Sequence, residues 1–317
     1  MKGFMKFCAI AALSCLLSGA VLIAAGSSAL GGGAIAAAVE KATGGRVSFH
    51  FSDWKEWGIS LFNRFPFVNR GWEDAPSFSK DHPTQSGDVA KHRLEGTFSR
   101  IDVEAGGCTF DVRDSGDGCF YVEATKADEF QAYVEDGTLY VKSDAKLVFG
   151  KVNDKSKVVF YVPAGHRFDG VRMELGAGTM SVGSLRAGEA SIEAGAGEIL
   201  VSGAEVDRLE LSVGMGYIEL EGMNVNRLNV SVGMGAVTAR GSVSGNVRAD
   251  CSMGSVELTL EGSRNDFNYD LDCSMGTIWL DGEEYGGMGM SKAFDNGAGK
   301  SMEADCSMGE VTIRFVK

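Results

Sequence analysis

The sequence predicts an all-β fold, a β-solenoid (single-chain β-helix) built from coils of about 19 residues, which follows an amino-terminal transmembrane helix. Two observations predict the solenoid. Similar segments begin at residues 171, 190, 209, 228 and 247, and within each segment apolar and polar residues alternate as in a strand with one buried face. A short period of strands is typical of a solenoid, in which each coil buries its apolar side by stacking on its neighbours. A third observation, a long uncharged stretch near the start of the chain, predicts the helix.

Residues 1–40 form the predicted transmembrane anchor. The range Phe7–Val39 contains no charged residue, and Lys2 and Lys6 precede it. This length suffices to cross a bilayer, and the basic flank predicts a cytoplasmic amino terminus with the rest of the chain outside the cytoplasm. A cleaved signal peptide is the alternative, because Ser27 and Ala29 offer a small-x-small cleavage site. We favour the uncleaved single-pass anchor, since the apolar stretch is longer than the core of a signal peptide.

Residues 41–95 are predicted to form a juxtamembrane amphipathic segment and a stalk. Five apolar residues lie on one stripe of a possible helix, which indicates either an interfacial helix beside the membrane or packing on the first coil. After Pro66 the chain becomes polar and irregular, so we expect a surface stalk without a packed core. The stripe consists of Trp54, Trp57, Leu61, Phe62 and Phe65.

Residues 96–170 contain strand-like runs that do not follow the repeat period. Alternating runs on both sides of Asp136-Gly137 indicate a hairpin. Terminal units of a solenoid differ from the others because they cover an open sheet edge, so this region is the predicted amino-terminal β cap. We expect Cys108 and Cys119 to be reduced, with a disulfide between them as the alternative.

Residues 171–317 carry the predicted coils, and a glycine marks one corner of each. The apolar set shifts by an odd step across this corner, which would turn later side chains to the other face unless the chain bends. Glycine suits such a bend because it tolerates positive φ and close backbone approach. The first five corner glycines follow one constant spacing, and the last two intervals are longer. The corner glycines are Gly178, Gly197, Gly216, Gly235, Gly254, Gly276 and Gly309.

Two further columns precede the corner glycine. The residue directly before it is methionine in the last five copies, and the residue three before it is cysteine in the last three. Both columns stay in phase with the apolar set, so we predict a core ladder, in which methionine fills irregular gaps and free cysteine packs as a small apolar residue. A soft-metal site of thioethers and thiolates is the alternative. The ladder consists of Met215, Met234, Met253, Met275, Met308, Cys251, Cys273 and Cys306.

The longest interval between corner glycines contains a glycine-rich insertion between Gly282 and Ser301. The insertion lacks alternation, although the repeat motif is unchanged on either side of it. We therefore expect it to loop out of the coil, so that replacing it with a short turn would preserve the fold.

An outward column lies four residues before the corner glycine. In the last three copies it holds Asp250, Asp272 and Asp305, which we expect to stack about 4.8 Å apart. Like charges at this spacing repel unless water or a cation intervenes. A solvated acidic face is the favoured interpretation, and a calcium ion or a basic partner is the alternative.

A resemblance to a known family rests on the segment KVVFYVPAGHRFDGVRMELGAGTMSV, in which a strand ends at Pro163 and a short turn leads into the first Gly-x-Gly corner. This pattern resembles the bacterial putative-adhesin β-strand-repeat family, a domain family of unknown function. The resemblance covers Thr97–Lys317. It implies the fold and a surface or envelope-stress-associated role, and it implies no catalytic residue.

Composition agrees with an exported protein that does not bind nucleic acid. The net charge is −13 and the isoelectric point is about 4.8, which opposes binding of polyanions. The four histidines show no metal-binding spacing, and no nucleophile elbow or phosphate loop is present. His166 follows a turn at Pro163, where we expect it to be solvated.

The sequence therefore predicts a protein that is not an enzyme and needs no cofactor. The favoured function is a membrane-anchored extracytoplasmic module for binding, adhesion or structure at the bacterial cell envelope, with an unknown protein or cell-wall partner. One alternative is a partner in envelope-stress signalling. The other is an enzyme that acts on polysaccharides, which would need paired carboxylates or a basic cluster on one face.

Overall fold

The computed structural model describes residues 76, 78–144 and 156–316. The predicted anchor and the aromatic stripe of the juxtamembrane segment lie outside these residues. Within the described part of the chain, no helix combines the length and the apolar character that crossing a membrane requires.

The described chain is all-β, as predicted. Its strands are hydrogen bonded into one continuous sheet, and a single 3-10 turn, η1 (Arg264–Asp266), interrupts them. The strands are β1 (Gln85–Arg93), β2 (Arg100–Asp114), β3 (Tyr121–Glu135), β4 (Thr138–Asp144), β5 (Lys157–Val162), β6 (Phe168–Val182), β7 (Leu185–Ala194), β8 (Glu198–Val201), β9 (Ala204–Val213), β10 (Tyr217–Val232), β11 (Ala236–Val243), β12 (Val247–Cys251), β13 (Ser255–Glu261), β14 (Phe267–Cys273), β15 (Thr277–Leu280), β16 (Glu283–Gly286), β17 (Met290–Phe294), β18 (Lys300–Cys306) and β19 (Glu310–Val316).

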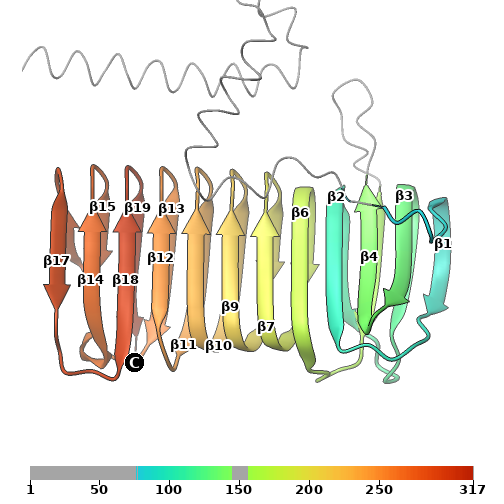
Figure 1. The fold of residues 1–317 in the computed structure, drawn as a ribbon, viewed down its shortest axis with the longest axis horizontal. Coiled ribbons are helices and arrows are strands. Elements are labelled where there is room, and N and C mark those ends of the chain that lie inside the picture. Colours follow the sequence, from blue (N-terminus) through green and yellow to red (C-terminus); the bar gives the residue numbers. More distant parts are fainter. Residues whose placement is uncertain (1–75, 77, 145–155, 317) are drawn as a thin grey trace, which may run out of the picture. The chain divides into compact units, whose positions relative to one another are not determined.

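Successive coils pair in parallel, and their register equals the repeat period of the sequence. Val171 pairs with Ala190, Ala190 with Leu209, Leu209 with Leu228, and Leu228 with Val247. The period seen in the sequence is thus the length of one turn of chain, and these residues stack on their counterparts in the next copy. Figure 1 shows the coils side by side.

Each coil contributes one stretch of extended chain to each of two faces, and β6 and β10 run from one face to the other without a break. We call the strands that end at the glycine corner the first face, and the strands that begin after it the second face. Along β9, Leu209, Leu211 and Val213 are buried while Glu210 is exposed. Ile218 on the second face is buried as well, with 0% exposure. The core is therefore the narrow space between the faces, filled by alternate residues of both.

The last coil does not occupy the last position in the stack. Met302 of β18 pairs with Val247 on one side and with Tyr269 on the other, and β19 likewise lies between β13 and β15. The chain thus builds the outer coil, β14–β15, before it returns to fill the gap, as the order β17, β14, β18, β12 in Figure 1 shows.

The glycine-rich insertion makes this return possible, and the expectation of an excursion that loops out of the coil is wrong. β16 pairs antiparallel with β15, and β17 pairs antiparallel with β14. The loop back to β18 is fastened by Asn268, whose side chain accepts hydrogen bonds from the backbone of Asn296 and Ala298. The insertion is therefore the carboxy-terminal cap. Its strands β16 and β17 are the edge strands at this end of the sheet. The final strand, β19, is not an edge strand, because it lies between β13 and β15.

A related arrangement closes the other end. β2 pairs in parallel with β6, so that Ile101 stacks on Val171, and β2 pairs on its other side with β4 and β5. Antiparallel β3 covers β4 and β5, and β1 covers β3. The predicted cap region therefore contains one coil, β2, which matches the repeats in register although three strands, β3 to β5, separate Ile101 from Val171 along the chain.

The cap begins before the predicted boundary at residue 95. Gln131 is fully buried, and its side-chain amide donates hydrogen bonds to the carbonyls of Ser79 and His82 and to the hydroxyl of Thr84. The imidazole of His82 stacks on Tyr133 at a ring distance of 3.9 Å. The segment around Ser79 and His82, which was predicted to belong to a stalk without a core, thus packs on the cap. The buried side-chain amide of Gln131 satisfies the backbone carbonyls of these two residues.

Candidate functional site

The corner glycines lie where predicted, at the turns between the two faces. A Cβ atom added to any of the seven would come to 3.0 Å or less from atoms of the adjacent coil, mostly the carbonyl of its corner glycine. Only Gly178 has a positive φ, of 98°. Close approach of neighbouring backbones, more than unusual dihedral angles, therefore requires glycine at this column.

The methionine half of the predicted core ladder is wrong. Met215 is 44% exposed and Met275 is 61% exposed, and Met234 is half-buried. The strand of the first face ends two residues earlier, at Val213, so the alternation that would direct Met215 inward has already stopped. The methionines occupy the outer side of the corner instead.

The cysteine half of the ladder is buried as predicted. Cys251, Cys306 and Cys273 stack in this order on successive first-face strands. The hydrogen bond with the Cys251 thiol, together with burial, raises the pKa of the Cys306 thiol, and burial raises the pKa of Cys273. The same hydrogen bond lowers the pKa of the Cys251 thiol. Cys306 and Cys273 are therefore protonated, enclosed thiols, which are inert packing groups. Burial likewise raises the pKa of Cys108 to about 11, and both Cys108 and Cys119 are free thiols.

The three aspartates of the outward column stand side by side on the first face. Asp305 pairs in register with Asp250 on one side and with Asp272 on the other. The counter-charge comes from Arg248, whose guanidinium donates to Asp250 at 2.9 and 3.1 Å and to Asp305 at 3.2 Å. Arg248 also forms an ion pair with Glu303 at 2.5 Å. An arginine thus occupies the place that the alternative interpretation assigned to a calcium ion.

The electrostatics of this cluster follow from burial and crowding. Burial, the hydrogen bond with Asp250 and its charge raise the pKa of Asp305 to about 6. The hydrogen bonds with Asp250 and Glu303 raise the pKa of Arg248, which stays charged. Among the described residues, no group of histidine, cysteine, aspartate or glutamate side chains is arranged to hold a metal ion. The cluster is therefore a salt-bridge network centred on Arg248, in which the carboxylates outnumber the one guanidinium.

A second network on the same face was not expected from the sequence. Arg172 forms ion pairs with Asp102 at 3.4 Å and with Glu174 at 2.5 Å, and Lys142 bonds Glu104 at 3.1 Å. Burial raises the pKa values of Asp102 and Glu174. The residues come from β2, β4 and β6. These strands are neighbours because β2 lies between β4 and β6 in the sheet. Sequence spacing carries no signal for such a contact.

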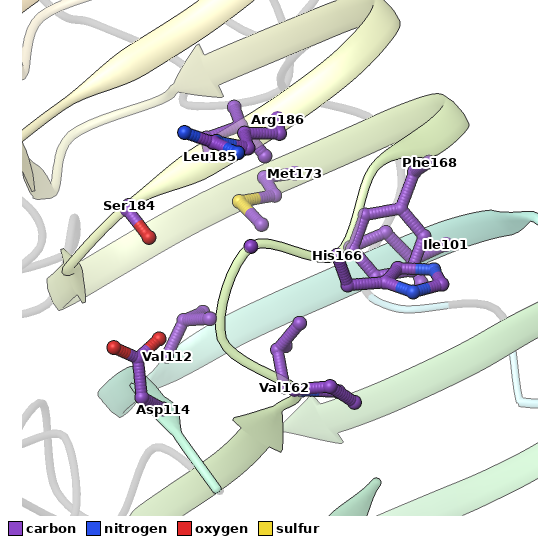
Figure 2. Close-up of a pocket in the computed structure, with 12 residues that line it drawn as sticks. Ile101, Val112, Asp114, Val162, His166, Phe168, Met173, Ser184, Leu185 and Arg186 are labelled. Atoms are coloured by element: carbon purple, nitrogen blue, oxygen red, sulfur yellow. The ribbon is translucent and has the colours of Figure 1, made fainter. Parts of the chain in front are cut away.

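His166 lies in a small pocket rather than in solvent (Figure 2). Its ring packs against Phe168 at 4.5 Å and Phe120 at 5.0 Å, and its Nε2 atom is buried without a hydrogen-bond partner. Burial lowers the pKa of His166, which favours the neutral ring. The pocket has a volume of about 10 Å³, room for about one water molecule. In Figure 2 the ring points away from Asp114 and Ser184.

A larger depression of about 250 Å³ lies across three coils, at the residues that directly precede Ala190, Leu209 and Leu228. It is open to solvent and lined by charged and polar side chains, with an ion pair between Arg208 and Glu189. Small-molecule sites are usually concave, mostly apolar and about 300–1,000 Å³ in volume. Neither pocket has these properties.

The comparison with protein families decides the affiliation. The Toastrack DUF4097 family matches residues 98–273, more than half of the chain. The chain belongs to the Toastrack DUF4097 family. This match confirms the resemblance to a family of unknown function. It runs from just before β2 to the end of β14, so that β15–β19 of the Toastrack chain lie beyond it.

Solved structures resemble this Toastrack chain at low sequence identity. A putative adhesin from Bacteroides fragilis is 15% identical, covers 75% of this chain with 98% of its own, and gives a TM-score of 0.37. A putative lipid binding protein from Parabacteroides distasonis is 16% identical, covers 74% of this chain with 96% of its own, and gives 0.46. No curated protein matches the sequence.

Proposed function

We propose that this Toastrack chain is a membrane-anchored extracytoplasmic β-solenoid that serves as a binding, adhesion-like or structural module at the bacterial cell envelope. The observation that supports it best is the arrangement of its polar groups. They lie in rows along the two faces, one residue per coil, and the two pockets described above are too small or too open to enclose a substrate. A surface of this kind suits a macromolecular partner.

The centre of the first face is the part we assign to the partner. It lies between the network of Arg172 and the network of Arg248, and it presents Glu193 and Glu210 together with serine and asparagine side chains. Carboxylates on a polar face favour a partner that carries basic groups. The uncharged stretch Phe7–Val39 supports the membrane anchor, and the basic residues before it support the extracytoplasmic location.

Photocrosslinking in intact cells tests this proposal. A photoreactive amino acid replaces Ser212 or Ser231 on the first face of the full-length protein, and Thr238 on the second face provides the matched control. We expect the two first-face positions to capture the same envelope partner, and Thr238 to capture none. The double variant Glu193→Gln and Glu210→Gln should weaken that capture.

Two outcomes would refute the proposal. Capture from neither face would contradict a binding role. Release of soluble fragments from purified cell-wall polysaccharide by the full-length protein would show that the chain is an enzyme.

A further inference from the structure

Five methionines form a row along the outer side of the glycine corner. The row consists of Met215, Met234, Met253, Met308 and Met275. Their order in space follows from hydrogen bonds between adjacent turns. The backbone N–H of Met234 donates to Gly214, that of Met253 to Gly233, that of Met308 to Ser252 and that of Met275 to Ser307.

The methionine row therefore occupies five consecutive coils, about 4.8 Å apart. It follows the turns along the upper edge of the sheet in Figure 1, from the corner after β9 to the corner after β14.

Packing does not explain these residues. Four of the five are between 37% and 61% exposed, whereas Met173 and Met180 of the core are 1% and 0% exposed. Alanine takes the same column in the two preceding coils, at Ala177 and Ala196, so the turn itself does not require a long side chain.

The residues that adjoin the row in sequence are small. Each methionine stands between two small residues, which are glycine on both sides of Met215 and Met234 and serine and glycine around the other three. No large side chain adjoins the row within its own turn. The methionines of neighbouring coils are thus adjacent and at least partly exposed. A methionine side chain has three rotatable bonds with which to bring its sulfur toward the next.

The chemistry of this donor set is specific. Neutral thioether sulfur is a poor ligand for calcium, magnesium or manganese and a good one for soft cations such as Cu(I). The aspartate column lies three residues before the methionines, at Asp250, Asp305 and Asp272, and adds negative charge beside the row. We propose that the methionine row binds a soft monovalent cation of the Cu(I) or Ag(I) class, held by thioethers of two or three adjacent coils.

Competition with a chromophoric Cu(I) chelator tests this proposal in the full-length protein, under anaerobic conditions and in detergent micelles. The test variant carries Met→Leu at all five positions, which preserves apolar area and approximate volume. The matched control carries Met173→Leu and Met180→Leu in the core. We expect the wild-type protein and the control to withdraw Cu(I) from the chelator, and the five-leucine variant to bind it roughly tenfold more weakly or worse.

A second variant separates the row from the buried thiols. Cys251, Cys306 and Cys273 are each replaced by valine, the residue that stands in this column at Val213 and Val232. The proposal requires that this variant keep its Cu(I) affinity.

Circular dichroism first confirms that each variant is folded. Equal Cu(I) affinity of the five-leucine variant and the wild type would overturn the proposal, and so would loss of binding in the valine variant alone. A partner or lipid surface that binds the wild type and the five-leucine variant equally, with no Cu(I) uptake by either, would show that the row is an apolar docking surface instead.

Discussion

Replacing one corner glycine with alanine should test the stacking of the coils directly. In Gly235→Ala the added methyl group would approach the carbonyl of Gly216 and lie 2.5 Å from Cγ1 of Val213. Real Cβ atoms essentially never come this close to another atom. Because Val213 is buried and the Gly216 carbonyl accepts a hydrogen bond from Ala236 at 3.1 Å, neither neighbour is free to move away.

The expected cost has two parts. Overpacking of a close-packed region costs about 1–3 kcal/mol, and a weakened backbone hydrogen bond costs about 1 kcal/mol more. Gly235→Ala should therefore lower the free energy of unfolding by about 2–4 kcal/mol. Urea unfolding of the full-length protein in detergent, followed by circular dichroism, measures the change.

Gly203→Ala provides the matched control. Gly203 also lies in a turn, but the atom nearest to its added Cβ is 4.0 Å away and its φ is not in the left-handed region. This variant should differ from the wild type by no more than about 0.5 kcal/mol. If Gly235→Ala proved as stable as Gly203→Ala, neighbouring coils would not approach each other at this corner, and the register described above would be wrong.

Three further predictions concern the cap, the acidic cluster and the thiols. Replacing residues 283–299 with a short Gly-Ser turn should remove the outer strands β16 and β17 and lower the β-sheet circular dichroism signal, whereas an unchanged spectrum would mean that the cap is dispensable. Because the pKa of Asp305 is raised to about 6, the folded state binds more protons than the unfolded state between about pH 4 and pH 6. The contribution of Asp305 to stability therefore falls as pH rises through this window, and Asp305→Asn should flatten the pH dependence of unfolding relative to Asp272→Asn. Alkylation followed by peptide mapping should modify half-exposed Cys119 first and buried Cys306 only after unfolding, and equal rates would contradict the burial.

The repeat itself is a local property, which explains why the sequence predicts it well. Strand alternation depends on which residues face the core, and the register between coils depends on the length of chain in one turn. The sequence therefore identifies Leu209, Leu211 and Val213 as buried, because they alternate with polar residues. The corner glycines lie where two backbones come too close for a Cβ atom.

The methionine row shows where alternation stops being informative. Val213 and Met215 are two residues apart and would share a face if the strand continued, but the strand ends at Val213. The apolar alternation continues in the sequence beyond the last residue of the strand, and nothing in the sequence marks where the strand ends. The inward direction predicted for Met215 was wrong for this reason.

The sequence by itself determined an all-β chain, the length of the coil, the glycine corners, the buried cysteines and the contact between aspartates of successive coils. Only the tertiary structure decided the order of coils at the two ends, where β2 and β18 are inserted between strands that come from elsewhere in the chain. The physical reason is that all coils present nearly the same apolar columns, so β18 can pair with β12 or with β14 at similar cost. The choice rests on the antiparallel strands β16 and β17, which cover the outer edge and leave the inner gap as the one position for the last coil.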